Sequence, residues 1–472
     1  MDPAVRSVRV RHSSMRHTVV ISDIHLCEVE RTSGLWMRYR QAAFSPDREL
    51  AEMIAELRRQ VRGDALTFVL NGDVFDFDAP RVVGEESVFH DLPRTAENAV
   101  TTMGAILDDH PIVVDALGRL LAEGHEVVFI SGNHDVQLTL PAVRALLTER
   151  LIDAAKGGTG ESREAFGARI AYRAWFHQTA DGIVIEHGNQ YDAFCSYRYP
   201  MAPFGRDTRE IQPTMGSLAT RNLISRMGYF NPHVDSSFML SAPGYVLHWA
   251  RYYLFSRRSL ALAWANGAVR TLLELLRVRD PGTKTRRRWN LASAAKETGV
   301  TLRRVARHAR LAQGPAEDRL GLVVRELWVD RAALLSAVVL IGLVWLLVAS
   351  GPLLAGAALA PILFVGYELF VPKTPLDATW RAVQRAARKV AAIHKASAVI
   401  FGHTHQPEGV WDTGMFLGNT GSWSAAFKDL ECTQPLYEAR PVIWLKSEAS
   451  KGLEGGLATW KDGRFTEQPA KG

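Results

Sequence analysis

The sequence has little cysteine and only a mild excess of positive charge. Its three cysteines, Cys27, Cys195 and Cys432, lie far apart among 472 residues and form no CxxC pair. This spacing argues against a disulfide framework or a zinc ribbon, and it favours a reducing compartment. The formal net charge of +6 is too small to indicate a specific nucleic-acid partner. The N-terminal stretch MDPAVRSVRVRHSSMRH lacks an apolar segment, so we do not expect it to be a secretory signal.

One long stretch, residues 332–367, lacks charged residues altogether and reads AALLSAVVLIGLVWLLVASGPLLAGAALAPILFVGY. A helix that crosses the bilayer core needs about 20 apolar residues. The stretch holds nearly two such segments, divided by SGP at 350–352. The pattern therefore predicts a transmembrane helical hairpin within residues 332–371. Because Pro361 and Glu368 interrupt its second half, a re-entrant hairpin is one alternative. A hairpin buried in the core of a soluble protein is another.

Basic residues flank the uncharged stretch on both sides. They are Arg319, Arg325 and Arg331 before it, and Lys373, Arg381, Arg385, Arg388 and Lys389 after it. Cationic flanks stay on the cytoplasmic side of a membrane, so both ends of the hairpin are predicted to be cytoplasmic. The expected location is the inner membrane, with the rest of the chain on its cytoplasmic face. Residues 245–279 mix aromatic, aliphatic and arginine residues, as either an interfacial amphipathic helix or a core helix would.

Five apolar, β-branched runs each end in a cluster of Asp, Asn, Gly and His. They are TVVISDIHL (18–26), LTFVLNGDVFDFD (66–78), EVVFISGNHD (126–135), GIVIEHGNQYD (182–192) and AVIFGHTHQP (398–407). Continuous Val, Ile and Phe runs are typical of strands covered on both faces, and the segments between the first three runs have helical patterns. The sequence therefore predicts a layered α/β fold in which the polar clusters converge on one sheet edge.

Nearly all the polar residues in these clusters are of types that bind metal ions. The candidate ligands are Asp23, His25, Asp73, Asn133, His187, His403 and His405. Asp23 and His25 lie two residues apart, and the two histidines of GHTH have the same spacing. Side chains alternate with period two along a strand, so the members of such a pair point the same way. The mixture of carboxylate, amide and imidazole suits Mn²⁺, with Fe or Zn²⁺ as alternatives, and the lack of thiolate argues against a structural zinc site.

The order D-x-H, GDxxD, GNHD, H-G and GHTH resembles that of the calcineurin-like metallophosphoesterase superfamily, over about residues 1–192 and 395–425. The resemblance implies a four-layer αββα β-sandwich with a dinuclear metal site at one sheet edge. We predict the N-terminal part of this domain at residues 1–194, a helical insertion that contains the hairpin at 195–390, and the C-terminal part of the domain at 391–472.

The resemblance also implies a role for each residue that matches a motif. Asp23, His25, Asp73 and His405 would bind the first metal ion, and Asp73, Asn133, His187 and His403 the second. His134 resembles the family's catalytic histidine, which donates to the leaving oxygen or polarises the phosphate, and Asp76 resembles the acid that orients it. Asp135 is interpreted as a structural cap of its loop. The implied reaction is in-line attack of a metal-bridging hydroxide on phosphorus.

The motifs SDIHL, GDVFD and GHTHQP are similar to those of a bacterial branch that includes the UDP-2,3-diacylglucosamine pyrophosphatases. This chain has His134 where that group has arginine, and the group has nothing like the hairpin, so its substrate cannot be carried over. We predict a phosphoester or pyrophosphate substrate, with a lipid-linked one favoured by the apolar insertion, and membrane lipid as a partner. A membrane-tethered scaffold without catalytic activity is the alternative from a different class, although every ligand position is filled.

Overall fold

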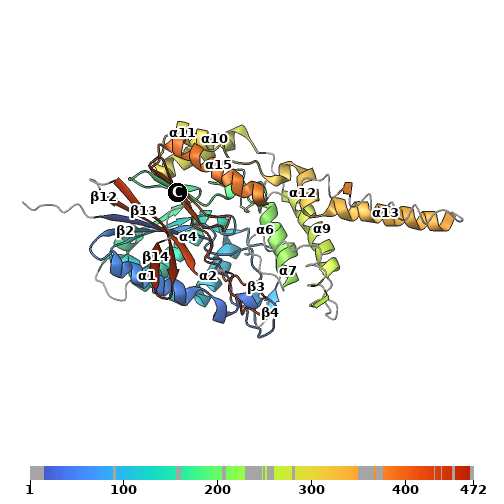
Figure 1. Ribbon diagram of the computed structural model, residues 1–472, viewed down its shortest axis with the longest axis horizontal. Coiled ribbons are helices and arrows are strands. Elements are labelled where there is room, and N and C mark those ends of the chain that lie inside the picture. The colour runs from blue at the N-terminus through green and yellow to red at the C-terminus, as the bar shows by residue number, and fades with distance from the viewer. Residues whose placement is uncertain are drawn as a thin grey trace, which may run out of the picture.

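Two β-sheets lie face to face at the centre of the computed structural model, and helices cover both outer faces (Figure 1). The layers therefore alternate helix, sheet, sheet, helix. The described residues are 15–84, 86–88, 92–155, 161–204, 209–228, 247, 250–251, 260–278, 282–348, 366–367, 376–429, 431–436, 438–448 and 452–467.

The first sheet has the strand order β14-β13-β12-β1-β2-β5-β6. Its strands are β1 (Arg16–Ile21), β2 (Ala65–Asn71), β5 (Glu126–Ile130), β6 (Ile170–Arg173), β12 (Arg440–Glu448), β13 (Gly452–Lys461) and β14 (Arg464–Glu467). Strands β1, β2, β5 and β6 run parallel, and β12 pairs antiparallel with the other side of β1. The carboxyl ends of β1, β2 and β5 therefore lie next to one another at one edge of the sheet.

The second sheet has the order β10-β11-β9-β8-β7. Its strands are β7 (Phe176–Gln178), β8 (Ile183–Glu186), β9 (Ala398–Phe401), β10 (Glu408–Asp412) and β11 (Met415–Asn419). Strands β8 and β9 are distant in sequence, yet they pair in parallel, so their carboxyl ends are also neighbours. A separate hairpin pairs β3 (Arg81–Val83) with β4 (Glu86–Val88).

Aliphatic side chains from both sheets fill the space between them. Val20 and Val69 of the first sheet belong to the same buried cluster as Ile400 of the second. Val19 and Ile21 point the other way, into the cluster that the first sheet shares with its helices. This alternation follows from the two-residue period of a strand, and it explains the continuous apolar run within each of these strands.

Each outer face of the sandwich is covered by its own set of helices (Figure 1). The first sheet is covered by α1 (Asp47–Gln60), α2 (Ala96–Asp109), α3 (Pro111–Ala122) and α4 (Pro141–Ala155). The second sheet is covered by α10 (Lys284–Thr298), α11 (Leu302–His308) and α15 (Leu376–His394). The mixed α/β class predicted from the sequence is confirmed. Most of the second helical layer falls within residues 195–390, so the predicted insertion supplies one layer of the core, because Val305 and Val390 pack onto the second sheet.

The remaining helices of residues 195–390 form a second, smaller group. They are α6 (Met215–Ala219), the π-helical turn η6 (Thr220–Ile224), α7 (Ser225–Met227), α9 (Leu260–Val278), α12 (Leu320–Glu326) and α13 (Val329–Val348). Leu218, Leu275 and Val323 form part of its buried centre. The other short elements are α5 (Arg163–Gly167), η1 (Arg38–Arg40), η2 (Ala42–Phe44), η3 (Val136–Thr139), η5 (Asn189–Tyr191) and η8 (Ala316–Asp318).

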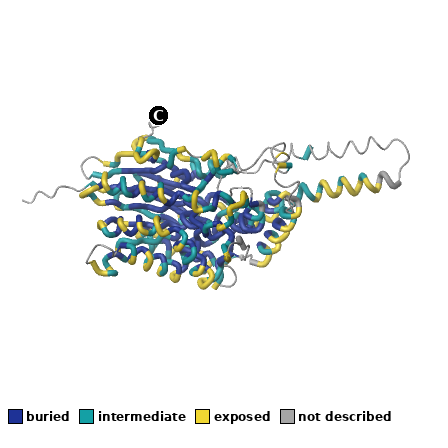
Figure 2. Tube along the Cα trace, turned by 90° about the horizontal axis from the view of Figure 1, so that it is seen from below, coloured by how far each residue is buried: buried dark blue, intermediate teal, exposed yellow. Residues whose placement is uncertain are grey.

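Helix α13 projects from the body of the molecule (Figure 1), and much of its surface is exposed (Figure 2). Within the described residues, no single helix has the length and hydropathy expected of a membrane span. Helices α12 and α13 reach these values only together, as a pair bent by 69°. Most of the second half of the predicted hairpin, residues 349–365 and 368–371, lies outside the described residues. The hairpin therefore remains a prediction.

Candidate metal centre

The seven predicted ligands all lie just beyond the carboxyl ends of strands. Asp23 and His25 follow β1, Asp73 follows β2, Asn133 follows β5, His187 follows β8, and His403 and His405 follow β9. Because β1, β2 and β5 are neighbours in the first sheet, and β8 and β9 are neighbours in the second, the two sheets bring these loops together at a common edge. The fold therefore gathers residues from both ends of the chain.

Two groups of ligand atoms converge at this edge. They are Asp23, His25 and His405 in one group and Asp73, His187 and His403 in the other, and within each group the ligand atoms all lie within 4.8 Å of one another. In the first group, Nε2 of His405 lies 3.0 Å from Oδ1 of Asp23. In the second, Nε2 of His187 lies 3.0 Å from Oδ2 of Asp73. Each group contains three of the four ligands that the sequence predicts for one ion position.

Two buried oxygen atoms at this edge, Oδ1 of Asp23 and Oδ1 of Asn133, accept no hydrogen bond from the described part of the chain. The short contact between Asp23 and His405 lacks the geometry of a hydrogen bond. A buried polar atom without a partner is costly, and it is uncommon in native proteins. A cation would provide the missing interaction, and these oxygens together with imidazole nitrogens fit Mn²⁺, Fe or Zn²⁺.

Asp73, a member of the second group, is held by side-chain and backbone contacts. Its Oδ2 contacts His187, and its Oδ1 accepts a hydrogen bond from the backbone N–H of His134 at 2.7 Å. Burial opposes ionisation of Asp73, but His187 and His134 outweigh it and hold the pKa of this carboxyl well below its usual range. The carboxylate is therefore ionised, which is the form that binds a metal ion.

The backbone at five of the seven ligands adopts the left-handed conformation. The φ angles are 54° at Asp23, 56° at His25, 51° at Asp73, 66° at His403 and 56° at His405. Each such residue costs on the order of 1–3 kcal/mol, and the conformation persists only where the surrounding structure enforces it. Here the loops enforce it on one another, because Asp23 and His25 donate backbone hydrogen bonds to the carbonyls of Gly72 and Asp73 at 3.1 and 3.0 Å.

Glycines in the motifs leave room for ligands from neighbouring loops. A Cβ atom on Gly132 would lie 2.2 Å from Oδ1 of Asp73, and one on Gly402 would lie 2.8 Å from Oδ2 of Asp23. Real side chains do not approach so closely, so a larger residue at either position would displace a ligand. The glycines of GNHD and GHTH are thus required by the approach of one ligand loop to the next.

Asp135 fastens two of the ligand loops together. Its Oδ1 accepts a hydrogen bond from the backbone N–H of Gly132 at 2.6 Å, and its Oδ2 accepts one from Val74 at 2.8 Å. The backbone N–H of Phe77 donates to the carbonyl of His134 at 3.0 Å in the same region. Asp135 therefore has the capping role that the sequence predicts for it.

His134 lies beside the first group of ligands. Its ring centroid is 4.9 Å from that of His25, with the two rings nearly perpendicular. Its Nδ1 lies 3.1 Å from Oδ1 of Asp76. A carboxylate beside Nδ1 favours the tautomer that carries a proton on this nitrogen. The arrangement fits the predicted pairing of His134 with Asp76.

A buried polar network links the second sheet to its helices directly behind His187. Glu186, the preceding residue, accepts hydrogen bonds from the hydroxyl of Tyr191 at 2.7 Å and from the indole of Trp175 at 3.2 Å, and its Oε1 lies 3.1 Å from Nε2 of His308. Nδ1 of His308 lies 3.1 Å from Nε2 of His394. Burial lowers the pKa of His394 to about 4. Helices α11 and α15 are thereby fixed to the strand that carries His187.

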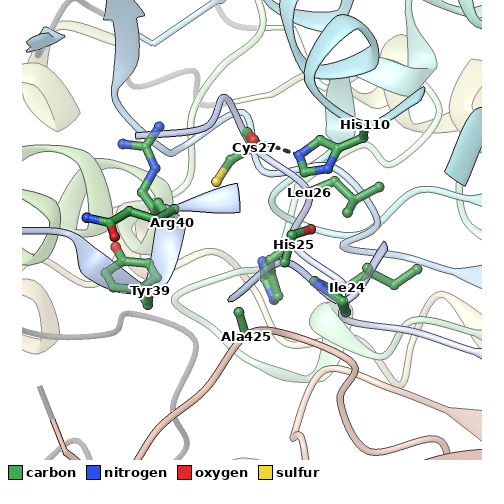
Figure 3. Close-up of a pocket in the computed structure, with 11 residues that line it drawn as sticks. Ile24, His25, Leu26, Cys27, Tyr39, Arg40, His110 and Ala425 are labelled. Carbon is green, nitrogen blue, oxygen red and sulfur yellow. Dashed lines mark hydrogen bonds between the residues drawn. The ribbon is translucent and has the colours of Figure 1, made fainter. Parts of the chain in front are cut away.

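A small cavity of about 30 Å³ borders the site behind His25, and Cys27, Tyr39 and Arg40 also line it (Figure 3). The guanidinium of Arg40 donates to the carbonyls of Glu28 and Pro80 at 2.6 and 2.8 Å. Burial raises the pKa of the Cys27 thiol to about 11. Cys27 is therefore an unreactive packing residue, since thiolates are the reactive form.

The geometry agrees with one comparison to known proteins. Residues 16–227 match the model of the family described as calcineurin-like phosphoesterase. The match supports the superfamily, whose members are metal-dependent hydrolases that act on phosphoester bonds and use two metal ions. Residues 16–227 are therefore similar to a metallophosphoesterase domain. His403 and His405 lie beyond the matched residues, and the structure brings them to the same site. No curated protein matches the chain.

The sequence patterns do not single out three polar residues that the structure places at the site. Oδ2 of Asp192 lies 3.3 Å from Nε2 of His403, and Oδ2 of Asp78 lies 3.2 Å from Nδ1 of His134. Asp192 and Asp78 are each the last residue of one of the polar clusters that follow the strands. Their position after a strand is the feature of the sequence that could have identified them as site residues. The third residue, Arg221, is 2% exposed and follows no motif. Only the folded chain shows where it lies.

Proposed function

We propose that this chain hydrolyses a phosphoester or pyrophosphate bond at the cytoplasmic face of a membrane, with two divalent ions held by the seven ligands. The observation that carries the proposal is the convergence of Asp23, His25 and His405 beside Asp73, His187 and His403 at one edge of the sandwich. Mn²⁺ is the expected metal, with Fe or Zn²⁺ as alternatives.

Two bound divalent ions would polarise the phosphoryl oxygens and lower the pKa of the attacking water. The residues of the chain supply the remaining functions. Asp73 would serve as a ligand to both ions, while the interlocked loops hold the ligands in place before substrate binds. His134, held at Nδ1 by Asp76, presents Nε2 to the leaving oxygen, where proton donation is worth about 10²–10⁴-fold in rate.

Ligand substitutions in the purified protein test this proposal. Asp73→Asn or His405→Ala is expected to abolish turnover of phosphodiester and phosphomonoester substrates with Mn²⁺ supplied. Asp462→Asn is a matched control, because Asp462 also has a left-handed backbone, with φ of 50° against 51° for Asp73, but is exposed in the turn between β13 and β14. Near-normal turnover by the Asp73 or His405 variant would contradict the proposal.

The membrane location is proposed from helix α13. Three consecutive residues, Val339, Leu340 and Ile341, are 51%, 62% and 60% exposed. Successive helical residues point about 100° apart, so the exposed apolar surface is not confined to one face. In a soluble helix pair, the partner helix would cover one stripe of this surface, whereas a bilayer would surround the helix on all sides.

The junction between α13 and the body has the composition of a membrane interface. The guanidinium of Arg331 lies 5.3 Å from the ring centroid of Trp328, which is 46% exposed. Tryptophan and arginine concentrate at the level of lipid headgroups. Exposed apolar residues on α9, Leu262 and Val269 among them, are consistent with contact of this helix with the same surface.

A lipid-linked pyrophosphate, of the type cleaved by UDP-2,3-diacylglucosamine pyrophosphatases, is the second candidate substrate. The exposed apolar helix favours it, because a helix inserted in the bilayer would hold the chain at the surface where lipid-linked substrates lie. Detergent-solubilised enzyme should then turn over lipid pyrophosphates faster than soluble diesters at equal concentration. A preference for soluble diesters would contradict the lipid substrate, but it would not contradict the proposed phosphoesterase activity.

A membrane-tethered scaffold without catalytic activity is the competing proposal. It predicts well under one transition metal ion per chain in the purified protein and no turnover with Mn²⁺ supplied. Mass spectrometry for metals separates it from the enzyme, which should contain about two ions per chain.

A further inference from the structure

The segment that follows the His187 loop reaches back to the loops that carry Asn133 and His134. The hydroxyl of Tyr197 donates to the backbone carbonyl of Asn133 at 3.1 Å, and Nη2 of Arg221 donates to the carbonyl of Phe77 at 3.2 Å. Ser217 is hydrogen-bonded to the carboxyl group of Asp78. Tyr197, Ser217 and Arg221 are 7%, 3% and 2% exposed, so these contacts exclude water.

Two carboxyl groups face the same nitrogen of His134. Its Nδ1 lies 3.1 Å from Oδ1 of Asp76 and 3.2 Å from Oδ2 of Asp78. Oδ1 of Asp76 also accepts backbone hydrogen bonds from Asp78 and Ala79, at 2.9 and 3.1 Å. Nδ1 can carry a single proton, and its hydrogen bond is to Asp76. Oδ2 of Asp78 accepts no hydrogen bond from the described residues, so it acts on His134 through its charge at ion-pair distance.

Arg221 adds a buried positive charge near the two buried carboxyl groups of Asp76 and Asp78. Asp76, Asp78 and Arg221 are each 2% exposed, and a buried carboxylate without a partner is strongly unfavourable. Burial raises the pKa of Asp78 to about 7, while His134, Ser217 and Arg221 favour its ionised form. Arg221 therefore allows two adjacent carboxyl groups to remain near one imidazole.

We propose that Asp78, held by Ser217 and Arg221, is a second positioning residue for His134, which acts with Asp76 to fix the proton on Nδ1 and direct Nε2 to the leaving oxygen. The inference rests on the proposed phosphoesterase function. It assigns residues from the predicted insertion to the support of the catalytic histidine, so the turn η6 and helix α6 belong functionally to the metal centre.

A double-mutant cycle tests this role. We measure kcat and KM with Mn²⁺ for the wild type, Asp78→Asn, His134→Ala and the double variant, using a p-nitrophenyl diester and an alkyl diester with a poorer leaving group. Asp78→Asn is expected to lower kcat by about 10-fold or more with little change in KM, and more for the poorer leaving group, since proton donation matters most there. In the His134→Ala background it should have no further effect.

Arginine variants provide a rescue test. Arg221→Gln should reproduce the loss seen for Asp78→Asn, and Arg221→Lys should recover most of it, because the lysine restores the positive charge. Arg277→Gln is the control, since Arg277 is exposed on α9 in the same part of the chain. If Asp78→Asn fails to fold, as judged by thermal unfolding, Ser217→Ala replaces it and removes one hydrogen bond to Asp78.

The outcomes separate this inference from the function on which it rests. Equal loss on the wild-type and His134→Ala backgrounds, or wild-type kcat in Asp78→Asn, would overturn the positioning role while the phosphoesterase stands. An inactive wild type would overturn both. Metal content measured on each variant shows whether a loss of activity comes instead from loss of the ions.

Discussion

Nε2 of His187 lies 3.0 Å from Oδ2 of Asp73, although the two residues follow strands of different sheets. His187 follows β8 in the second sheet, and Asp73 follows β2 in the first. The contact therefore joins the two layers of the sandwich at the edge where the candidate ligands converge. The relative placement of the sheets decides whether the two ion positions form.

Single-ligand variants should lose different ions. His187→Ala is expected to leave about one ion per chain, because only the second position loses a ligand. His405→Ala should also leave about one ion per chain, because only the first position loses a ligand. Asp73→Asn should lose both, since the sequence predicts Asp73 as a ligand of both ions. Mass spectrometry of metals in the purified variants gives the counts. Two ions retained in all three variants would show that the metals bind elsewhere.

Gly132→Ala should weaken metal binding without unfolding the domain. The added Cβ would lie 2.2 Å from Oδ1 of Asp73, so the carboxylate must move. Displacing a ligand's supporting contacts typically costs about 10–100-fold in metal affinity. Titration with Mn²⁺ measures the change. Gly314→Ala is the control, because nothing lies within 4 Å of its Cβ position, and equal affinity in the two variants would contradict the packing argument.

His110 should stabilise the loop after His25 in a manner that depends on pH. Its Nδ1 lies 2.9 Å from both carboxylate oxygens of Asp47, and its Nε2 lies 2.8 Å from the carbonyl of Cys27, so both nitrogens act as donors in the charged form. Burial lowers the pKa of His110, but Asp47 and Cys27 outweigh it and the net shift is upward.

A raised pKa in the folded state means that the contribution of His110 is complete below its unfolded pKa of about 6.5 and declines as pH rises through the folded value. His110→Leu should therefore destabilise the protein most at acidic pH, by about 1–3 kcal/mol. Urea unfolding of both proteins at pH 5.5, 7 and 8.5 measures the difference in the free energy of unfolding. A difference that grows with pH would have the wrong sign.

Lysine substitutions on α13 should release the protein from membranes. Each lysine at the centre of a membrane-inserted helix costs about 2.5–3.5 kcal/mol, so Leu340→Lys with Ile341→Lys should move the protein from vesicle-bound to soluble fractions in flotation experiments. Val83→Lys is the control, because Val83 is also exposed, at 56%, on the hairpin of β3 and β4. Vesicle binding retained by the double variant would exclude insertion of α13.

The strand positions and the grouping of the ligands could be predicted because they depend on local pattern. An apolar strand such as β1, followed directly by Asp23 and His25, specifies both the element and the place where the polar side chains leave it. Parallel neighbouring strands then bring successive clusters to one edge. The left-handed backbone at these residues has no comparable signal, since it is imposed by contacts between loops.

The parts that sequence patterns miss depend on long-range packing. Arg221 follows no motif, and its role is visible only because η6 folds against the carbonyl of Phe77. Residues 195–390 read as a separate insertion because of the uncharged stretch, yet α10, α11 and α15 form the outer layer of the second sheet. Amphipathic helices show in sequence that they have an apolar face, but not which surface covers it.

The order of strands also determines where local unfolding begins. Strands β1, β2 and β5 have neighbours on both sides in the first sheet, as do β8 and β9 in the second, whereas β14, β6, β10 and β7 form the borders. Local opening starts at such borders, where each strand has one hydrogen-bonded neighbour. Amide hydrogens of β10 and β14 should therefore exchange with solvent before those of the strands that carry the ligands, and the metal centre should be among the last regions to come apart.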